Sequence, residues 1–303
     1  MRFSHYLLAL ACTFTLAACQ PDSGTPSNEA KAPVAPATSE PAPPAQPQAV
    51  SAADEVGQRL QAVVAGEHRK AEDQTRDQYR HPVETLTFFG VQPDSTVIEI
   101  TPGGGWYTDV LAPFLRAHGH YIAAIWDESL PDQPAYYARL NTALAERVSA
   151  SPDVYGEAEL RRFNAAAPVF GEPDTADFVL TFRNVHNWVP AGSAPAYFQA
   201  FYNVLKPGGV LGVVDHRAKG DEPTDGSGGY VTEQQVIDLA EAAGFQLAAR
   251  SQINSNPADT ADYAKGVWTL PPTFALGDED REKYAAIGES DRMTLKFVKP
   301  SAE

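Results

Sequence analysis

The sequence predicts an α/β fold in which helices cover both faces of a mainly parallel sheet. Three observations predict it. Apolar runs rich in β-branched residues alternate with segments of helical periodicity along residues 51–303. The first of these runs, residues 97–100, leads directly into a glycine-rich turn and the start of a helix. Residues 51–303 are also numerous enough to form one large domain with a substantial core.

Residues 1–18 have the pattern of an export signal peptide. Arg2 precedes an apolar run over residues 6–16, which is shorter than the about 20 residues that a membrane-spanning helix needs. Residues 16–19 read Leu-Ala-Ala-Cys and resemble the lipobox of bacterial lipoproteins. That resemblance implies cleavage before Cys19 and lipidation of this cysteine. We therefore expect a lipid-anchored protein of the cell envelope that faces the periplasm.

Residues 19–50 are predicted to be a linker between the lipid anchor and the globular domain, residues 51–303. They are rich in Pro, Ala, Ser and Gln and contain almost no large apolar side chain, so they cannot build a core. Gln20 follows the cysteine at the position where an aspartate would favour retention in the inner membrane. The outer membrane is therefore the expected location.

Cysteine usage and net charge exclude several classes of function. Cys12 lies in the predicted signal peptide and Cys19 is the predicted lipidation site, so the mature chain has no disulfide, thiol nucleophile or cysteine-based metal site. The formal net charge of −16 argues against binding to nucleic acid, whose phosphates would be repelled. It argues equally against adsorption to anionic lipid, so we expect membrane contact through the lipid anchor only.

Hydrophobic periodicity, turn residues and capping signals predict the elements of the globular domain in order. Residues 154–173 give no clear assignment. A capping box, Thr232 with Gln235, marks the start of the last long helix. The predicted helices are 51–71, 82–89, 106–117, 135–148, 194–205 and 232–243, and the predicted strands are 97–100, 121–126, 177–182, 210–214, 245–253 and 293–298, with a turn at 206–209.

The loop after the first strand carries the most specific pattern in the chain. Glu99, Thr101, Gly103 and Gly105 occupy the positions of Glu-x-Gly-x-Gly-x-Gly, and Gly104 lies between the last two. This pattern resembles motif I of class I S-adenosylmethionine (SAM) dependent methyltransferases, although Thr101 replaces the first glycine. The resemblance implies a Rossmann-like fold with seven strands, the last one antiparallel, and SAM bound by these residues. A dinucleotide fingerprint fits less well, because Thr108 stands at its third glycine.

Three further segments are expected at the same edge of the sheet, because ligands of open α/β sheets bind beyond the carboxyl ends of the strands. Asp127 ends the second strand at about the spacing expected for a carboxylate that binds ribose hydroxyls, and its alternative role is a helix N-cap. Arg183 and Asn184 follow the strand over residues 177–182 and are predicted to contribute to the cofactor site. Residues 215–217 follow the strand over residues 210–214.

Two histidines at this edge are candidates for the chemistry. Methyl transfer to oxygen or nitrogen requires alignment of the acceptor and removal of a proton, which a histidine can perform near neutral pH. His186, flanked by Asn184 and Asn187, is the first candidate for acceptor positioning or general base, and Asn187 is grouped with it. His216, next to Asp215, is the second. The alternative for each histidine is a structural hydrogen bond at a strand end.

A long polar connection precedes the last strand. It includes residues 254–260, 268–272 and 288–292, and long loops in a compact domain are often functional. Together with residues 183–188 and the glycine loop, these segments resemble a bacterial family of predicted methyltransferases. The resemblance covers nearly all of residues 51–300.

Three functions remain open from the sequence. The leading hypothesis is a SAM-dependent methyltransferase that acts on a small molecule and needs no metal; its location weighs against it, because SAM is made in the cytosol. The alternative is a non-catalytic envelope lipoprotein that uses the same fold to bind a small ligand. The third is a metal-dependent hydrolase built on His186, His216 and Asp215, which no HExxH-like spacing supports.

Overall fold

The computed structural model describes residues 52–301. The predicted signal peptide, the lipidation site at Cys19 and the linker over residues 19–50 lie outside the described residues. No helix within residues 52–301 combines the length and the apolar character needed to cross a bilayer.

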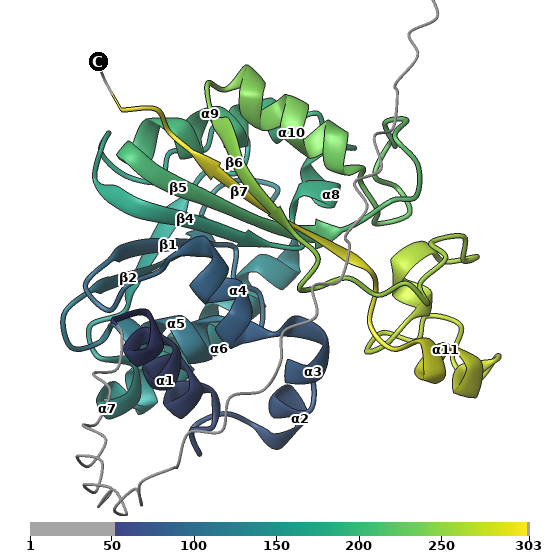
Figure 1. Cartoon of the computed structure of the whole chain (residues 1–303), viewed down its shortest axis with the longest axis horizontal. Helices are drawn as coiled ribbons and strands as arrows, with labels where there is room; N and C mark the ends of the chain where they lie inside the picture. Colours follow the sequence, from purple (N-terminus) through teal and green to yellow (C-terminus); the bar gives the residue numbers. More distant parts are fainter. Residues whose placement is uncertain (1–51, 302–303) are drawn as a thin grey trace, which may run out of the picture. The chain divides into compact units, whose positions relative to one another are not determined.

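Within the described residues, seven strands form one sheet in the order β3-β2-β1-β4-β5-β7-β6 (Figure 1). All neighbouring strands pair in parallel except β7, which lies antiparallel between β5 and β6. The predicted fold class, including the antiparallel last strand, is therefore confirmed. The strands are β1 (Thr96–Ile100), β2 (His120–Trp126), β3 (Glu159–Phe163), β4 (Ala176–Phe182), β5 (Leu205–His216), β6 (Gln246–Ser251) and β7 (Arg292–Val298).

Helices cover both faces of the sheet because the central strands are apolar on both sides. In β1, Val97 packs into the core beneath α1, α4 and α5, whereas Ile98 and Ile100 pack into the core beneath α9 and α10. The helices are α1 (Ala52–Val64), α2 (Ala71–Gln74), α3 (Asp77–Arg80), α4 (Pro82–Phe89), α5 (Thr108–Leu115), α6 (Ala135–Ala150), α7 (Pro152–Tyr155), α8 (Val185–Trp188), α9 (Ala194–Val204), α10 (Glu233–Ala242) and α11 (Arg281–Ile287), with a 3-10 turn, η1 (Gly266–Thr269).

Two predicted boundaries and one missing strand need correction. The first helix ends at Val64 instead of residue 71, where a turn over residues 65–69 precedes the short helix α2. The predicted turn at 206–209 lies inside β5, because the backbone of Gly208 and Gly209 exchanges hydrogen bonds of 2.8 and 2.9 Å with Lys299. The unassigned segment contains β3, an edge strand whose charged residues hide the strand pattern.

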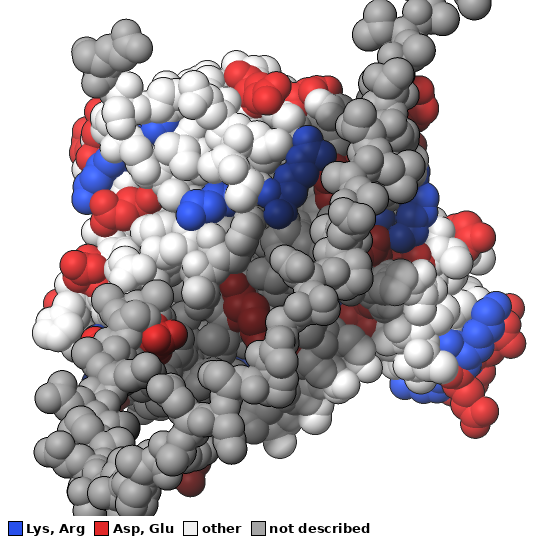
Figure 2. Space-filling model, in the orientation of Figure 1, with Lys and Arg blue, Asp and Glu red and all other residues white. Residues whose placement is uncertain are grey.

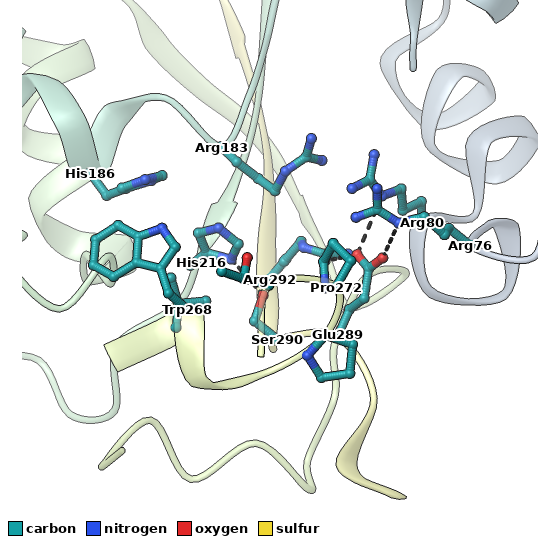
Figure 3. A pocket seen from close by; sticks show the side chains of 13 residues that line it. Arg76, Arg80, Arg183, His186, His216, Trp268, Pro272, Glu289, Ser290 and Arg292 are labelled. Carbon is teal, nitrogen blue, oxygen red and sulfur yellow. Dashed lines mark hydrogen bonds and ion pairs between the residues drawn. The ribbon is translucent and has the colours of Figure 1, made fainter. Parts of the chain in front are cut away.

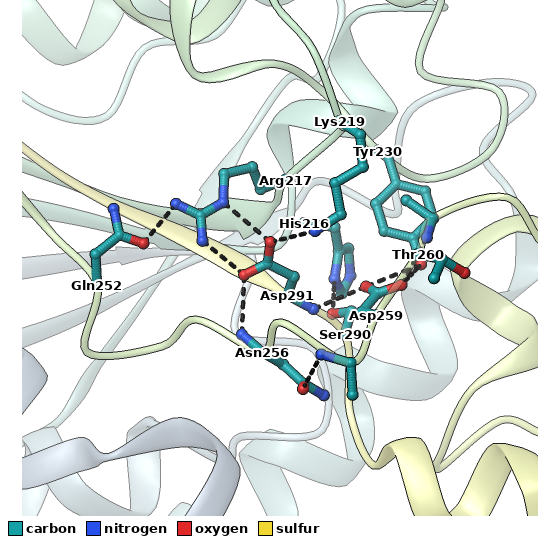
Figure 4. Close-up of polar contacts among 12 residues, drawn as sticks. His216, Arg217, Lys219, Tyr230, Gln252, Asn256, Asp259, Thr260, Ser290 and Asp291 are labelled. Carbon is teal, nitrogen blue, oxygen red and sulfur yellow. Dashed lines mark hydrogen bonds and ion pairs between the residues drawn. The ribbon is translucent and has the colours of Figure 1, made fainter.

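The segment over residues 252–291, which carries η1 and α11, lies outside the sheet and is tied by a polar network to the residues that follow β5 (Figure 4). The Asp291 carboxylate accepts hydrogen bonds from the Arg217 guanidinium at 2.7 Å and from the Lys219 ammonium at 2.8 Å. The Asp259 carboxylate accepts from the Tyr230 hydroxyl at 3.2 Å and from the backbone N–H of Asp291 at 2.8 Å. This network fixes the position of the segment beside the carboxyl end of β5.

Candidate functional site: two adjoining cavities at the edge of the sheet

A cavity of about 840 Å³ lies at the carboxyl ends of β1, β2 and β4. We call it the glycine-loop cavity, because Thr101, Gly103 and Gly104 line it directly after β1. Its other walls include residues at the ends of neighbouring strands. Trp126 is the last residue of β2, and Arg183 directly follows β4. This is the edge at which an open α/β sheet binds its ligands.

The backbone of the glycine loop leaves room for a ligand. Gly103 has a φ of +60°, in the left-handed region that favours glycine, and a Cβ atom added at Gly103 or Gly104 would meet no atom within 4 Å. Thr101 also has a positive φ, +45°, which is unusual for a β-branched residue. Its hydroxyl Oγ1 is buried and has no hydrogen-bond partner among the described residues. The loop therefore offers open space and one unsatisfied polar group.

Gly105 serves the packing of the loop instead of the cavity. A Cβ atom there would lie 2.8 Å from the Arg147 guanidinium and 3.1 Å from a methyl group of Leu144, both on α6. Gly105 is absent from the cavity lining, and its φ of +79° sets the turn into α5. We conclude that Gly105 allows α6 to approach the loop closely.

Glu99 lies beneath the loop and away from the cavity surface. It is 2% exposed, and its carboxylate accepts hydrogen bonds from the Tyr121 hydroxyl at 2.6 Å and the Thr108 hydroxyl at 3.2 Å. Burial is the main cause that raises the pKa of Glu99 to about 7. Its contacts join β1 to β2 and to the first turn of α5, so Glu99 braces the loop from below.

Asp127 follows β2, as predicted, but it does not line the glycine-loop cavity. Its carboxylate accepts from the backbone N–H of Ser129 at 3.1 Å and from the Ser129 hydroxyl at 2.6 Å, which forms a local Asx turn. No helix starts at Asp127, so the alternative helix N-cap role is wrong. Its contact with a ribose stays a prediction.

An aromatic wall that the sequence reasoning missed closes one side of the glycine-loop cavity. Trp126 and Tyr137 stack with ring centroids 4.1 Å apart and an angle of 1° between the planes, and Tyr136 packs edge-on against both. All three line the cavity. The available signal was the tryptophan at the end of the second strand, followed by a Tyr-Tyr pair at the start of the next helix.

Figure 3 shows the residues that line a second cavity. Its volume is about 330 Å³, and it adjoins the first cavity, with which it shares lining residues. We call it the histidine–arginine cavity, because His186 and His216 line it together with four arginines. Three of these arginines, Arg76, Arg80 and Arg183, also line the glycine-loop cavity, whereas Arg292 lines only the second one. The segment over residues 252–291 contributes the remaining wall, including Trp268, Pro272 and Glu289. The two cavities thus meet at the arginines.

The two histidines lie together, and each has a different partner. Their ring centroids are 5.1 Å apart. Nδ1 of His186 donates to the buried Asp215 carboxylate at 2.9 Å, whereas Nδ1 of His216 lies 2.5 Å from the Ser290 hydroxyl. His216 follows Asp215 in the sequence, but in the fold the Asp215 carboxylate binds the side chain of His186. Burial, followed by the charge of His186, holds the pKa of His216 well below its ordinary value, so His216 is neutral near pH 7.

The tautomer of His186 follows from its contact with Asp215. The carboxylate can only accept, so Nδ1 carries a hydrogen, and in the neutral imidazole the lone pair therefore lies on Nε2. Asp215 is itself fixed by backbone N–H groups of Val185 at 2.7 Å and His216 at 2.7 Å. This arrangement orients an imidazole whose free nitrogen can accept a proton.

The metal-hydrolase hypothesis was based on His186, Asp215 and His216. One possible metal-ligand atom from each of these residues lies within 4.8 Å of the other two. Both oxygens of Asp215 already accept hydrogen bonds from the protein. The guanidinium groups of the same cavity would also repel a divalent cation. This donor set therefore fits a hydrogen-bonded pair better than a metal centre.

Comparisons with known proteins identify the architecture. A scan against protein-family models and a search of curated proteins both find no match. Among solved structures, a SAM-dependent methyltransferase from Aquifex aeolicus is 14% identical, with a TM-score of 0.50, over 80% of this chain and 98% of that chain. The [4+2]-cyclase SpnF is also 14% identical, with a TM-score of 0.53, over 82% of this chain and 94% of that chain. This chain has the methyltransferase fold.

On the methyltransferase fold, the predicted site residues divide into three groups. Those that line the glycine-loop cavity are Thr101, Gly103, Gly104, Arg183, Asn184 and Asn187. Those that line the histidine–arginine cavity are Arg183, His186 and His216. Those that line neither are Glu99, Gly105 and Asp127. Asn187, which was grouped with the histidines, is exposed and belongs to the neighbouring cavity.

Proposed function

We propose that this protein is a SAM-dependent methyltransferase that acts on a small-molecule acceptor. The observation that carries the proposal is the pair of adjoining cavities at the carboxyl edge of the sheet. The larger one is built on the glycine loop, and the smaller one contains a histidine oriented by a carboxylate. Methyl transfer needs two ligands held next to each other, and this arrangement supplies two neighbouring sites.

The glycine-loop cavity fits a nucleoside-like cofactor on three grounds. Positions Gly103 and Gly104 are open, so a ligand can approach the backbone closely. The buried Thr101 hydroxyl has no hydrogen-bond partner within residues 52–301, and a ligand would supply one. Trp126 and Tyr137 provide an aromatic surface for a base. When bound there, SAM would supply an electrophilic methyl group.

The histidine–arginine cavity is proposed to hold the acceptor. A hydroxyl or amine acceptor must lose a proton as its new bond to the methyl carbon forms, and Nε2 of His186 is the atom available to accept it. The Asp215 carboxylate, 2.9 Å from Nδ1, keeps the imidazole in the required tautomer and stabilises its protonated form. His216 stays neutral and holds Ser290 by a hydrogen bond, so its role is to shape the cavity wall.

The first test is calorimetric titration of the full-length protein with SAM and S-adenosylhomocysteine. We expect micromolar binding of both. Tritium transfer from methyl-labelled SAM to small molecules of a cell extract, resolved by chromatography, then measures turnover. The His186→Ala variant should bind S-adenosylhomocysteine like the wild type and lose at least about 100-fold of turnover, which is the usual contribution of general acid–base catalysis. His118→Ala removes an exposed histidine and is the matched control.

The outcomes separate the functions that the sequence left open. No binding of either compound at millimolar concentration would contradict the proposal. Binding without any transfer would favour the non-catalytic ligand-binding protein, since a fold alone does not establish a reaction. Full turnover in His186→Ala would leave the cofactor site intact and remove the histidine from the mechanism.

We also propose that the protein is lipidated at Cys19 and faces the periplasm from the outer membrane, because residues 16–19 match a lipobox after a short apolar run. In a bacterial host, the full-length protein should partition into the detergent-rich phase after detergent phase separation. The Cys19→Ser variant should move to the aqueous phase or stay unprocessed. Equal partitioning of both proteins would refute lipidation at this residue.

A further inference from the structure

We propose that the acceptor bound in the histidine–arginine cavity is a small organic anion, with a carboxylate or phosphate group on the arginines and an apolar body against Trp268. This inference rests on the proposed function, because it names the substrate class of the same site. It is supported by the charge of the cavity, by unpartnered guanidinium nitrogens and by the exposed tryptophan.

Positive charge in this cavity is not balanced by the protein. Four arginines line it, and Glu289 is the one carboxylate that the described residues contribute to its lining. Glu289 pairs with Arg76 at 2.5 Å, with Arg80 at 3.3 Å and with Arg292. Burial opposes ionisation of this carboxylate, but Arg292, Arg80 and Arg76 outweigh it and hold the pKa of Glu289 well below its ordinary value. Glu289 is therefore charged, and it neutralises only one of four cations.

Arg183 is the arginine most available to a ligand. Its side chain makes no ion pair with the described part of the chain, and it extends toward Arg76 and Arg80 at the junction of the two cavities (Figure 3). Burial, followed by repulsion from Arg292, lowers the pKa of Arg183 to about 10, so it is still charged near pH 7. Its φ of +63° shows that the backbone holds it at this position despite local strain.

Two further guanidinium nitrogens lack partners in the buried wall of the cavity. Nη1 of Arg80 and Nε of Arg292 have no hydrogen-bond partner among the described residues, and these arginines are 4% and 3% exposed. A buried donor without a partner is costly, and the cost is higher when the donor is charged. An oxyanion has the acceptor geometry that guanidinium groups bind best. An anionic ligand would satisfy the charge and the donors together.

Trp268 provides the apolar part of the site. It lines the cavity, is 39% exposed, and lies with its ring 6.2 Å from the His186 ring. A large aromatic side chain that lines a polar cavity and is partly exposed indicates contact with an apolar ligand surface. Pro271 and Pro272 extend the same wall. The acceptor is therefore an anion with an apolar body, and a free inorganic ion would leave this wall unused.

The positive charge of the histidine–arginine cavity does not follow from the overall composition, because the chain as a whole is acidic. The protein has 39 acidic and 23 basic residues, and acidic and basic side chains are interspersed on the face shown in Figure 2. Four arginines around one cavity of about 330 Å³ therefore form a local feature of the fold. A cationic acceptor would be repelled at this site.

The test uses aromatic probes of one shape and different charge. Benzoate, phenyl phosphate, benzamide and benzylamine are titrated into the full-length protein, free and saturated with S-adenosylhomocysteine, with tryptophan fluorescence and calorimetry as readouts. We expect one or both anions to bind at least about 10-fold more tightly than benzamide, which is the gain from one charge-assisted hydrogen bond, and benzylamine not to bind. The two anions distinguish a carboxylate from a phosphate ligand.

Two variants test the assigned contacts. Arg183→Gln removes the cation without leaving a carboxylate unpaired and should weaken anion binding about 10-fold or more, while benzamide binding stays unchanged. Trp268→Ala should weaken benzoate but not acetate. Arg250→Gln removes the same charge at an exposed surface pair with Glu233 and should change nothing. If Arg183→Gln fails to fold, the comparison of charged and neutral probes on the wild type still decides.

The proposal and the function on which it rests fail in different ways. Equal affinity for benzoate and benzylamine overturns the anion proposal whether or not S-adenosylhomocysteine binds. If the anions compete with S-adenosylhomocysteine, and Arg183→Gln loses affinity for it, the arginines bind the carboxylate of the cofactor and the acceptor proposal is overturned. If S-adenosylhomocysteine does not bind at all, the methyltransferase proposal fails, and anion binding to the free protein remains as the measured result.

Discussion

Replacing Gly103 by valine should weaken cofactor binding at a modest cost in stability. The added Cβ meets no atom within 4 Å, so the free protein can hold the side chain without a clash. The φ of +60° is unfavourable for valine and should cost about 1–2 kcal/mol. In a domain of this size that cost lowers the melting temperature by about 2–8 °C.

The same side chain would fill space that the ligand needs. Overpacking by a few methyl groups costs about 1–3 kcal/mol, so the affinity for S-adenosylhomocysteine should fall by about 5- to 150-fold. Calorimetric titration measures the affinity, and thermal unfolding measures the stability of the same preparation.

Two matched variants separate the effect of filling the cavity from backbone strain. Gly104→Val adds the same side chain at an open position of the same loop where φ is not positive, so it should reduce affinity with little loss of stability. Gly277→Val adds it at an exposed position with a φ of +66° and open space, so it should lose stability and keep affinity. Wild-type affinity in both Gly103→Val and Gly104→Val would show that the ligand does not occupy the glycine-loop cavity.

Four further predictions concern the core, a helix cap and the cavity walls. The pKa of Glu99 is about 7 in the folded protein, against 4.5 for the ordinary group. Between these pH values the folded protein therefore holds one more proton than the unfolded chain. The free energy of unfolding should fall by on the order of 3 kcal/mol as the pH rises from 4.5 to 7, and it should then level off. Glu99→Gln should remove that slope in denaturant titrations, and an identical slope in both proteins would refute it. Thr232→Ala removes the hydroxyl that accepts from Gln235 N–H at 3.2 Å and should cost about 1 kcal/mol, seen as a melting temperature lower by about 2–4 °C. Trp126→Ala should weaken S-adenosylhomocysteine binding by about 10-fold through loss of the aromatic wall, and unchanged affinity would place the base elsewhere. Thr101→Gly should weaken S-adenosylhomocysteine binding to a similar extent by removing the unpartnered hydroxyl, whereas Thr101→Ser should not. Equal affinity in the wild type and both variants would argue against a contact between the ligand and the Thr101 hydroxyl.

Most of the sheet could be predicted because each central strand carries its own local signal. Val97, Ile98 and Ile100 form an apolar run that suits a strand buried on both faces, and a glycine loop follows it. The strand β3 could not be predicted in the same way. It lies at the edge of the sheet, and Arg161 and Arg162 break the apolar pattern that identifies buried strands.

The candidate site was predictable only where it follows strand ends. Loops after parallel strands meet at one edge whatever their sequence, so the cluster of Thr101, Arg183 and His186 follows from topology. The remaining walls come from segments far away in the chain. Arg76 and Arg80 precede the first strand, and the sequence gives no reason to pair either of them with Glu289, more than 200 residues later. Such pairs depend on tertiary packing, which local patterns do not encode.

The long connection before the last strand gives the site its chemical character. Trp268, Glu289 and Ser290 of this segment line the cavity together with both histidines, and the Ser290 hydroxyl lies 2.5 Å from Nδ1 of His216. With the segment in place, the arginines face a partly enclosed space in which a charge-assisted hydrogen bond is stronger than in water. The net charge of −16 repels an approaching anion, and this repulsion fades beyond about 8 Å at physiological ionic strength. Selection of an anion must therefore arise from contact inside the cavity and not from long-range steering, because four arginines and one carboxylate of the described residues line that cavity.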